Sequence, residues 1–130
     1  RHSFVSNGTS SVSGIVFYNC SSEHDYAASE GHRRWSQGLL FDNIEFTSSE
    51  TDQLLGLYNR GRYGTGHGWA CTNCVAWNLN TNTIFRKIIV QKPPHRQNYA
   101  IGCNGLVTNA HQFSNPIGYI ELSKKEGAYS

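Results

Sequence analysis

Two segments of the chain combine histidine, arginine and aromatic residues, whose side chains can transfer protons, bind anions and stack on flat ligands. The segments are residues 23–35 and 59–69, and the side chains with this chemistry are His32, Arg34, Trp35, Arg60, Arg62, Tyr63, His67 and Trp69. Four glycines in residues 59–69 allow the backbone to adopt positive φ and to approach a ligand closely. The two segments therefore predict a site for an anionic ligand with acid–base groups beside it.

The charge distribution also favours an anionic partner. Residues 1–52 carry seven acidic residues and three arginines, whereas residues 53–120 carry six Lys or Arg residues and no acidic residue. Positive charge without compensation over such a length attracts anions, although it can equally belong to a solvated surface without a ligand. The chain has neither the spacing of a helix-turn-helix nor zinc-finger ligands nor the aromatic signature of RNA-binding sheets, so we expect no nucleic-acid partner. We expect no membrane partner either, because no apolar run approaches the roughly 20 residues of a spanning helix. An acidic polysaccharide is the partner that we expect.

Cysteines and glycosylation motifs indicate an extracellular protein. The four cysteines are disulfide candidates with three possible pairings, between which the sequence does not choose, and buried free thiols are the alternative: Cys20, Cys71, Cys74 and Cys103. A zinc site at Cys71 and Cys74 would need a second close pair of ligands, so no metal site is predicted. Asn7 and Asn19 each begin an Asn-x-Ser/Thr motif for N-glycosylation.

A short apolar segment that closes with asparagine recurs along the chain. The closing residues are Asn19, Asn43, Asn59, Asn78 and Asn104, at spacings of 24, 16, 19 and 26 residues. Such a period is typical of one β-solenoid coil per repeat. Asparagine tolerates the left-handed conformation of a sharp corner, and stacked amides can hydrogen-bond along a column. The repeat predicts an all-β fold, a right-handed parallel β-helix (solenoid) of about four to five coils.

The expected organisation is a single β-helix domain or a fragment of a longer β-helix. Residues 14–105 would form the core coils, residues 23–36 a loop insertion, and residues 106–130 a terminal coil or tail. Further strands are expected at residues 44–46, 84–85, 88–91 and 117–120, and a single helical turn at residues 48–55, where a capping serine precedes helix formers. Continuous apolar runs such as Gly-Ile-Val-Phe favour buried parallel strands over the alternating strands of an antiparallel sandwich, which is the alternative fold.

Several motifs resemble those of a known protein group. The matching stretches are residues 31–35 (GHRRW), 38–43 (GLLFDN), 59–60 (NR), 64–69 (GTGHGW), 75–78 (VAWN), 90–94 (VQKPP) and 97–105 (QNYAIGCNG). Over residues 14–105 the chain resembles the C-terminal part of secreted right-handed parallel β-helix proteins of the pectate-lyase-like superfamily, a group that includes polysaccharide lyases. The GTGHGW and QKPP…NYAIGCNG stretches are specific for the group, whereas the pair Cys71/Cys74 departs from it.

The resemblance implies β-elimination on an acidic polysaccharide. This reaction needs a cation for the sugar carboxylate, a base for the C5 proton and an acid for the leaving oxygen. The catalytic candidates are Arg34 and Arg60 as cations, His32 or His67 as base, and Tyr63 or a histidine as acid. The substrate-binding candidates are Trp35, Trp69, Arg62, Lys92 and Arg96. No cofactor is expected, apart from calcium on Asp25 and Glu30 as a weaker alternative.

Structural roles and other functions remain open alternatives. Residues 66–69 could form a tight corner with Trp69 in the core, and Arg34 could pair with Glu23, Asp25 or Glu30. A glycoside hydrolase would need paired carboxylates, which residues 53–120 lack, and no nucleophile-elbow motif supports a catalytic serine. The competing function is a non-catalytic structural or glycan-binding module that assembles end to end through open sheet edges.

Overall fold

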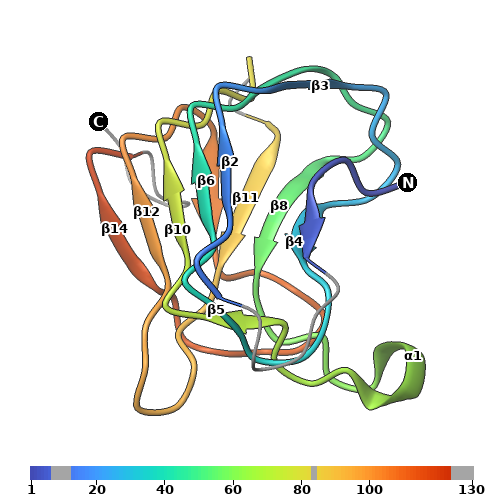
Figure 1. The fold of residues 1–130 in the computed structure, drawn as a ribbon, viewed down its shortest axis with the longest axis vertical. Helices are drawn as coiled ribbons and strands as arrows, with labels where there is room; N and C mark the ends of the chain where they lie inside the picture. Colours follow the sequence, from blue (N-terminus) through green and yellow to red (C-terminus); the bar gives the residue numbers. More distant parts are fainter. Residues whose placement is uncertain (7–12, 83–84, 124–130) are drawn as a thin grey trace.

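Parallel strand pairing dominates the computed structural model, which describes residues 1–6, 13–82 and 85–123. A five-stranded parallel sheet has the order β14-β12-β10-β6-β2 (Figure 1). Its strands are β2 (Val16–Tyr18), β6 (Leu40–Asp42), β10 (Val75–Trp77), β12 (Tyr99–Ile101) and β14 (Tyr119–Glu121). The register is continuous, because Leu40 pairs with both Val16 and Val75, and Tyr99 pairs with both Val75 and Tyr119.

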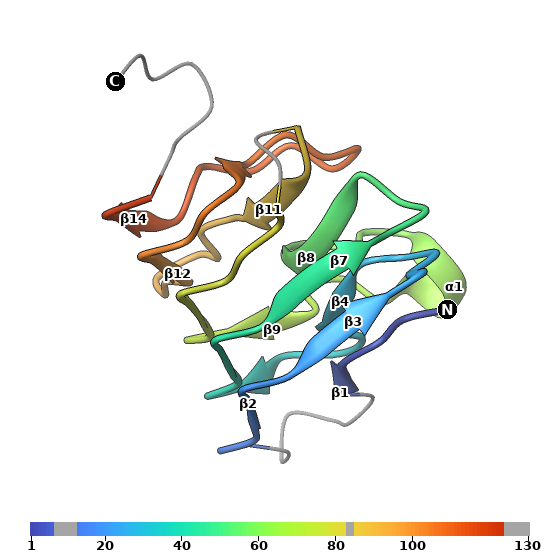
Figure 2. The same cartoon turned by 90° about the horizontal axis from the view of Figure 1, so that it is seen from above.

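A second five-stranded parallel sheet has the order β1-β4-β8-β11-β13. Its strands are β1 (Val5–Ser6), β4 (Ser29–Gly31), β8 (Gln53–Leu57), β11 (Lys87–Val90) and β13 (Leu106–Thr108). Two short parallel pairs complete the coils, β3 (Ser21–Glu23) with β7 (Glu45–Ser48) and β5 (Ser36–Gln37) with β9 (Cys71–Thr72). Because strands of the sheets alternate along the sequence, the chain winds as a parallel β-helix of about five coils, and Figure 2 shows the colours advancing along the stack.

The core lies between the two large sheets. In the first sheet the central residue of each short strand turns inward, so that Phe41, Ala76 and Ala100 are fully buried while Tyr18 is 66% exposed. The second sheet contributes buried residues such as Leu55, Ile88 and Val107. Strands of the first sheet are therefore buried on alternate residues. Strand β8 of the second sheet is buried nearly throughout, because the segment that contains Tyr58 and Ala70 covers its outer face.

Asparagine corners are present, but they form two columns. Asn19, Asn43 and Asn78 have φ values of 53, 54 and 51° after β2, β6 and β10, and Asn43 Nδ2 donates to Asn19 Oδ1 over 2.9 Å. The next corner, after β12, is formed by Gly102 (φ 66°) and not by an asparagine. A Cβ atom at this position would overlap the Asn78 side chain.

The remaining asparagines of the repeat lie elsewhere. Asn104 donates to Asn80 Oδ1 over 2.9 Å in a second column. Asn59 follows β8 in the opposite sheet. The assignment of one closing asparagine to every coil in a single column is thus wrong for Asn59 and Asn104, because one coil contributes an apolar strand to each sheet.

Two local expectations are also wrong. Residues 48–55 contain no helical turn, since β7 ends at Ser48 and β8 begins at Gln53; pairing with β4 and β11 overrides the local helix propensity. Residues 23–36 are not only a loop, because they contain β4. The expected strands at 44–46, 88–91 and 117–120 correspond to β7, β11 and β14, and position 84 lies outside the described residues.

The cysteines are all free thiols, so the predicted disulfides are not formed in this structure. Cys20 follows the β2 corner and Cys103 the β12 corner, three coils away, which corresponds to roughly 14 Å at the spacing of parallel strands. A disulfide needs Cα atoms closer than about 7 Å. Cys71 and Cys74 are both buried in the core, and the Cys74 thiol donates to the carbonyl oxygen of Thr72 over 3.3 Å.

Asn7 lies outside the described residues, and Asn19 is exposed at its corner, so glycosylation stays a prediction. No helix in the described part of the chain is long and apolar enough to cross a membrane.

Candidate functional site

The outer face of the second sheet positions the polar residues. Glu30 of β4 lies opposite Gly56 of β8 in the parallel register. His32 follows β4, and Arg60 follows β8 on the next coil. Because adjacent parallel strands end at the same edge, residues that are about thirty positions apart in the sequence become neighbours.

Gly56 creates the space that this cluster needs. A Cβ at position 56 would overlap the ring of Tyr58, which folds back over the strand. Tyr58, Ala70 and Ile89 form a small buried cluster on this outer face, separate from the main core. The folded-back ring carries its hydroxyl to Glu30, to which it donates a hydrogen bond of 2.8 Å.

A loop between Tyr58 and Ala70 brings His67 to the same place. Its two ends run antiparallel, with the Ala70 N–H donating to Tyr58 O over 3.0 Å and the Arg60 N–H donating to Gly68 O over 2.7 Å. The irregular helical turn α1 (Tyr63–Gly66) forms the tip. The imidazoles of His67 and His32 meet edge to face with ring centroids 5.1 Å apart.

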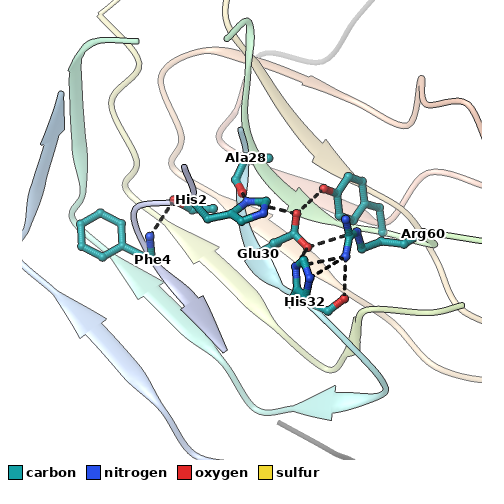
Figure 3. A network of polar contacts seen from close by, with 8 residues as sticks. His2, Phe4, Ala28, Glu30, His32 and Arg60 are labelled. Atoms are coloured by element: carbon teal, nitrogen blue, oxygen red, sulfur yellow. Dashed lines mark hydrogen bonds and ion pairs between the residues drawn. The ribbon is translucent and has the colours of Figure 1, made fainter. Parts of the chain in front are cut away.

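Glu30 is the centre of the network that Figure 3 shows. The carboxylate is 1% exposed; His32 Nδ1 lies 2.9 Å and Arg60 Nε lies 3.2 Å from its Oε2 atom. His2 Nδ1 lies 3.5 Å from Oε1 and 2.6 Å from the carbonyl oxygen of Ala28.

Burial changes the acid–base properties of this cluster. Burial raises the pKa of Glu30 to about 7, against the opposing effect of the Arg60 charge. Burial, followed by the charge of Arg60, lowers the pKa of His32 to about 4 and also lowers the pKa of His67. Both imidazoles are therefore neutral at pH 7 and can accept a proton.

His67 differs from His32 in the partners of its ring nitrogens. Its Nδ1 atom is buried without a hydrogen-bond partner among the described residues. Both ring nitrogens of His32, in contrast, lie 3.0 and 3.2 Å from Arg60 Nη1. Gly64 (φ 59°) leaves room for the His67 ring, since a Cβ there would overlap it.

A pocket lies on the neighbouring face that β5 and β9 form. It has a volume of about 310 Å³ and is lined by Trp35, Gln37, Thr72 and Arg96. Gln37 pairs with Thr72 in the parallel register, which sets both side chains on adjacent coils. Thr72 Oγ1 is buried without a hydrogen-bond partner among the described residues. The pocket thus combines an aromatic ring, a cation and the polar side chain of Gln37.

The two tryptophans connect the pocket with the cluster. Trp35 stacks on Trp69 with ring centroids 6.1 Å apart and an interplanar angle of 29°. Trp35 follows His32 by three positions, and Trp69 follows His67 by two. Trp69 is almost completely buried, so Trp35 is the ring that a ligand can reach.

The structure brings together most of the residues that the sequence singled out. His32, Arg60 and His67 lie in the cluster, and Trp35 and Arg96 line the pocket. Arg62 is exposed at the start of α1 and Lys92 is half-buried; neither is among the residues that line the pocket.

Some expected pairings are different. Among the described residues Arg34 has no acidic partner: its Nη2 atom lies 3.5 Å from the Thr65 carbonyl oxygen, and Arg60 lies beside Glu30 instead. Tyr63 lies under Arg60, with 5.7 Å between guanidinium carbon and ring centroid, and donates its hydroxyl proton to Gln112.

The two carboxylates that were considered for calcium have separate partners. Asp25 Oδ1 accepts hydrogen bonds from the hydroxyls of Ser3 and Ser22, whereas Glu30 binds Tyr58 and Arg60.

Sequence reasoning missed two members of the cluster. His2 lies 28 positions before Glu30 and beyond the recognised repeat, and its place depends on a parallel bridge to Ala27. The sequence alone suggests that Tyr58 is an ordinary core residue. The signal that could have identified it is Gly56 two positions earlier, which leaves room for the Tyr58 ring to fold back over β8.

Comparison with models of protein families, with curated proteins and with solved structures finds no match for this chain.

Proposed function

We propose that this chain acts outside the cell on an acidic polysaccharide, which it binds in the pocket of Trp35 and Arg96 and cleaves by β-elimination. The observation that carries the proposal is the pocket itself. Trp35 with its exposed indole ring, Arg96 with its guanidinium, Gln37 and the buried Thr72 line one pocket of about 310 Å³. This volume lies at the lower end of the range for small-molecule sites.

The chemistry of the pocket suits an acidic sugar. The Trp35 ring offers a flat apolar surface to the C–H groups of a sugar ring, and Arg96 offers a planar pair of donors to a carboxylate. Gln37, which is half-buried, can hydrogen-bond sugar hydroxyls. The resemblance of residues 14–105 to pectate-lyase-like polysaccharide lyases supports the same class of ligand and a secreted location.

His67 is the proposed base. Its neutral imidazole has a nitrogen without a partner, and the charges of Arg33, Arg34 and Arg60 act on it. In the reaction His67 takes the C5 proton, the released electron pair forms the C4=C5 double bond, and the bond between C4 and the glycosidic oxygen breaks. A hydroxyl such as that of Tyr63 then supplies the proton for the leaving oxygen.

Arg34 is the proposed partner of the carboxylate at the reacting sugar. It is exposed, and its hydrogen bond of 3.5 Å to the Thr65 carbonyl oxygen is at the upper limit of the usual distance. Arg60 is bound to Glu30 and therefore positions the cluster. A cation beside the carboxylate stabilises the negative charge that develops when the C5 proton leaves.

Ultraviolet absorbance of the unsaturated product tests the reaction with polygalacturonate, alginate and glycosaminoglycans. We expect product from at least one polymer, and a loss of about 100-fold or more in kcat for His67→Ala. Arg96→Gln should raise KM and leave kcat nearly unchanged. His24→Asn, at an exposed bend 43 positions before His67, is the matched control and should retain full activity. Absence of both product and binding with every polymer would overturn the proposal.

A non-catalytic module that stacks end to end is the second candidate. The outermost strands β2 and β14 each pair on one side only within the described chain, and their side chains Val16, Tyr18 and Tyr119 are exposed. Such edges can pair with further parallel strands. Polymer binding without product, together with concentration-dependent assembly in sedimentation experiments, would favour this function over the lyase.

A further inference from the structure

We propose that His2, Glu30 and His32 form a binding site for a divalent transition-metal ion of the zinc class, and that this ion competes with Arg60 for Glu30. Each of the three residues offers a ligand atom, and the three atoms lie within 4.8 Å of one another. Figure 3 shows the three side chains converging from two different segments. This proposal does not depend on the lyase reaction, whose base His67 is not one of the ligands.

The ligand set has the chemistry that zinc selects. Two imidazoles and one carboxylate leave further positions open for water or a substrate. The side chains of His2 and His32 are 16% and 24% exposed, so an ion can reach them from the surface.

Neighbouring groups hold the ligands in place. His2 Nδ1 donates a hydrogen bond of 2.6 Å to the Ala28 carbonyl oxygen, which leaves Nε2 as the nitrogen that can bind an ion. The Tyr58 hydroxyl donates to Glu30 Oε1 and fixes the carboxylate. Such outer contacts commonly orient the ligands of a metal ion.

Arg60 occupies the position that the ion would need. Its Nε atom lies 3.2 Å from Glu30 Oε2 and its Nη1 atom 3.0 Å from His32 Nδ1, so the guanidinium touches two of the three ligands. Zinc binds nitrogen and oxygen ligands at about 2.0–2.2 Å, which leaves no space for the guanidinium. The two cations also repel each other, and they are therefore mutually exclusive.

The contact between Arg60 Nε and Glu30 is an ion pair without a hydrogen bond. Arg60 Nε is buried and makes no hydrogen bond among the described residues, so the contact is one of charge rather than of aligned donor and acceptor. The side chain is 14% exposed and thus reaches the surface. A divalent ion on Glu30 can replace the charge of Arg60, and the guanidinium then turns toward solvent.

Calorimetric titration of the metal-free chain with Zn²⁺ tests the site. We expect one ion to bind, with an affinity that falls by about 10- to 100-fold in His2→Ala and in Glu30→Gln. Arg60→Met should bind Zn²⁺ about tenfold more tightly than the wild type, because the competing cation is gone. His24→Asn, which removes an exposed histidine outside the cluster, should leave the affinity unchanged.

Co²⁺ separates this site from the thiols of Cys71 and Cys74. Nitrogen and oxygen ligands give visible bands without the near-ultraviolet band of a cobalt–thiolate bond. The proposal is overturned if the thiolate band appears, if His2→Ala binds as tightly as His24→Asn, or if Arg60→Met binds no more tightly than the wild type. If Glu30→Gln or Arg60→Met fails to fold, the comparison of His2→Ala with His24→Asn still tests whether the ion binds at this site.

Discussion

Glu30 connects three segments of the chain through one buried carboxylate. Its neighbours are His2 near the first strand, His32 on its own coil, and Tyr58 and Arg60 on the next coil. A carboxylate without these partners would be strongly destabilising in such a buried position. The polar cluster and the stacking of the first coils therefore depend on the same contacts.

His32→Gln tests the effect of burial on the imidazole. The pKa of His32 is about 4 in the folded chain, against 6.5 as its ordinary value, so between these values the unfolded chain binds the additional proton. Stability due to His32 is thus complete above pH 6.5 and decreases as the pH falls toward 4. We expect the wild type to lose stability relative to His32→Gln over this range in urea unfolding. A stability difference that does not change with pH would contradict the low pKa.

The sequence predicted the histidines and arginines of the cluster but not how they pair. Spacing along the chain placed Arg34 nearest to the acidic residues, whereas the fold brings Arg60 to Glu30 from the next coil. Which of two nearby arginines reaches a carboxylate depends on strand register. Register is a property of the stacked coils, and the local sequence does not contain it.

At the scale of the strand, Gly56 and Tyr58 act as a pair. An alanine Cβ at position 56 would overlap the Tyr58 ring and push its hydroxyl away from Glu30. We expect Gly56→Ala to lower the free energy of unfolding by about 1–3 kcal/mol. In a Tyr58→Ala background the same change should cost much less, since the overlapping ring is absent. Equal costs in both backgrounds, measured by urea unfolding, would show that the ring is not the cause.

At the corners, the left-handed backbone and the amide column can be separated by experiment. Asn43 has φ 54° and donates to Asn19 Oδ1. Asn43→Gly keeps the backbone conformation and loses only the hydrogen bond, whereas Asn43→Ala also meets the left-handed strain of about 1–2 kcal/mol. We expect Asn43→Ala to be the less stable variant in thermal unfolding, with Asn43→Gly between it and the wild type. The reverse order would contradict the role of the corner conformation.

The coils could be predicted because Asn19, Asn43 and Asn78 repeat a local requirement for a corner. The two-sheet arrangement could not, because apolar strands of both sheets look alike: Leu54 to Leu57 read as one more turn of the same column. The helical turn expected at residues 48–55 failed for a related reason. A short segment adopts the structure that its neighbours on adjacent coils can hydrogen-bond, whatever its own preference.

The two halves of the chain, acidic and basic, become successive levels of one stack. Residues 1–52 carry most of the acidic residues and form the first coils, whereas residues 53–120 carry six Lys or Arg residues and form the later ones. Arg60 belongs to the basic half but forms an ion pair with Glu30 of the acidic half. Arg96 is exposed at the pocket. The uncompensated positive charge is therefore available to a polyanion.

Salt dependence tests whether that charge binds a polyanion at the pocket. Polygalacturonate binding should weaken as sodium chloride is raised, because the screening length falls to about 10 Å at 0.1 M. Dextran, a neutral polymer, gives the baseline for non-ionic contacts. Arg96→Gln should bind polygalacturonate more weakly at low salt and depend less on salt than the wild type. Lys87→Gln removes the same charge from β11, outside the pocket lining, and should behave almost like the wild type. If both variants weaken binding equally, net charge and not the pocket attracts the polymer.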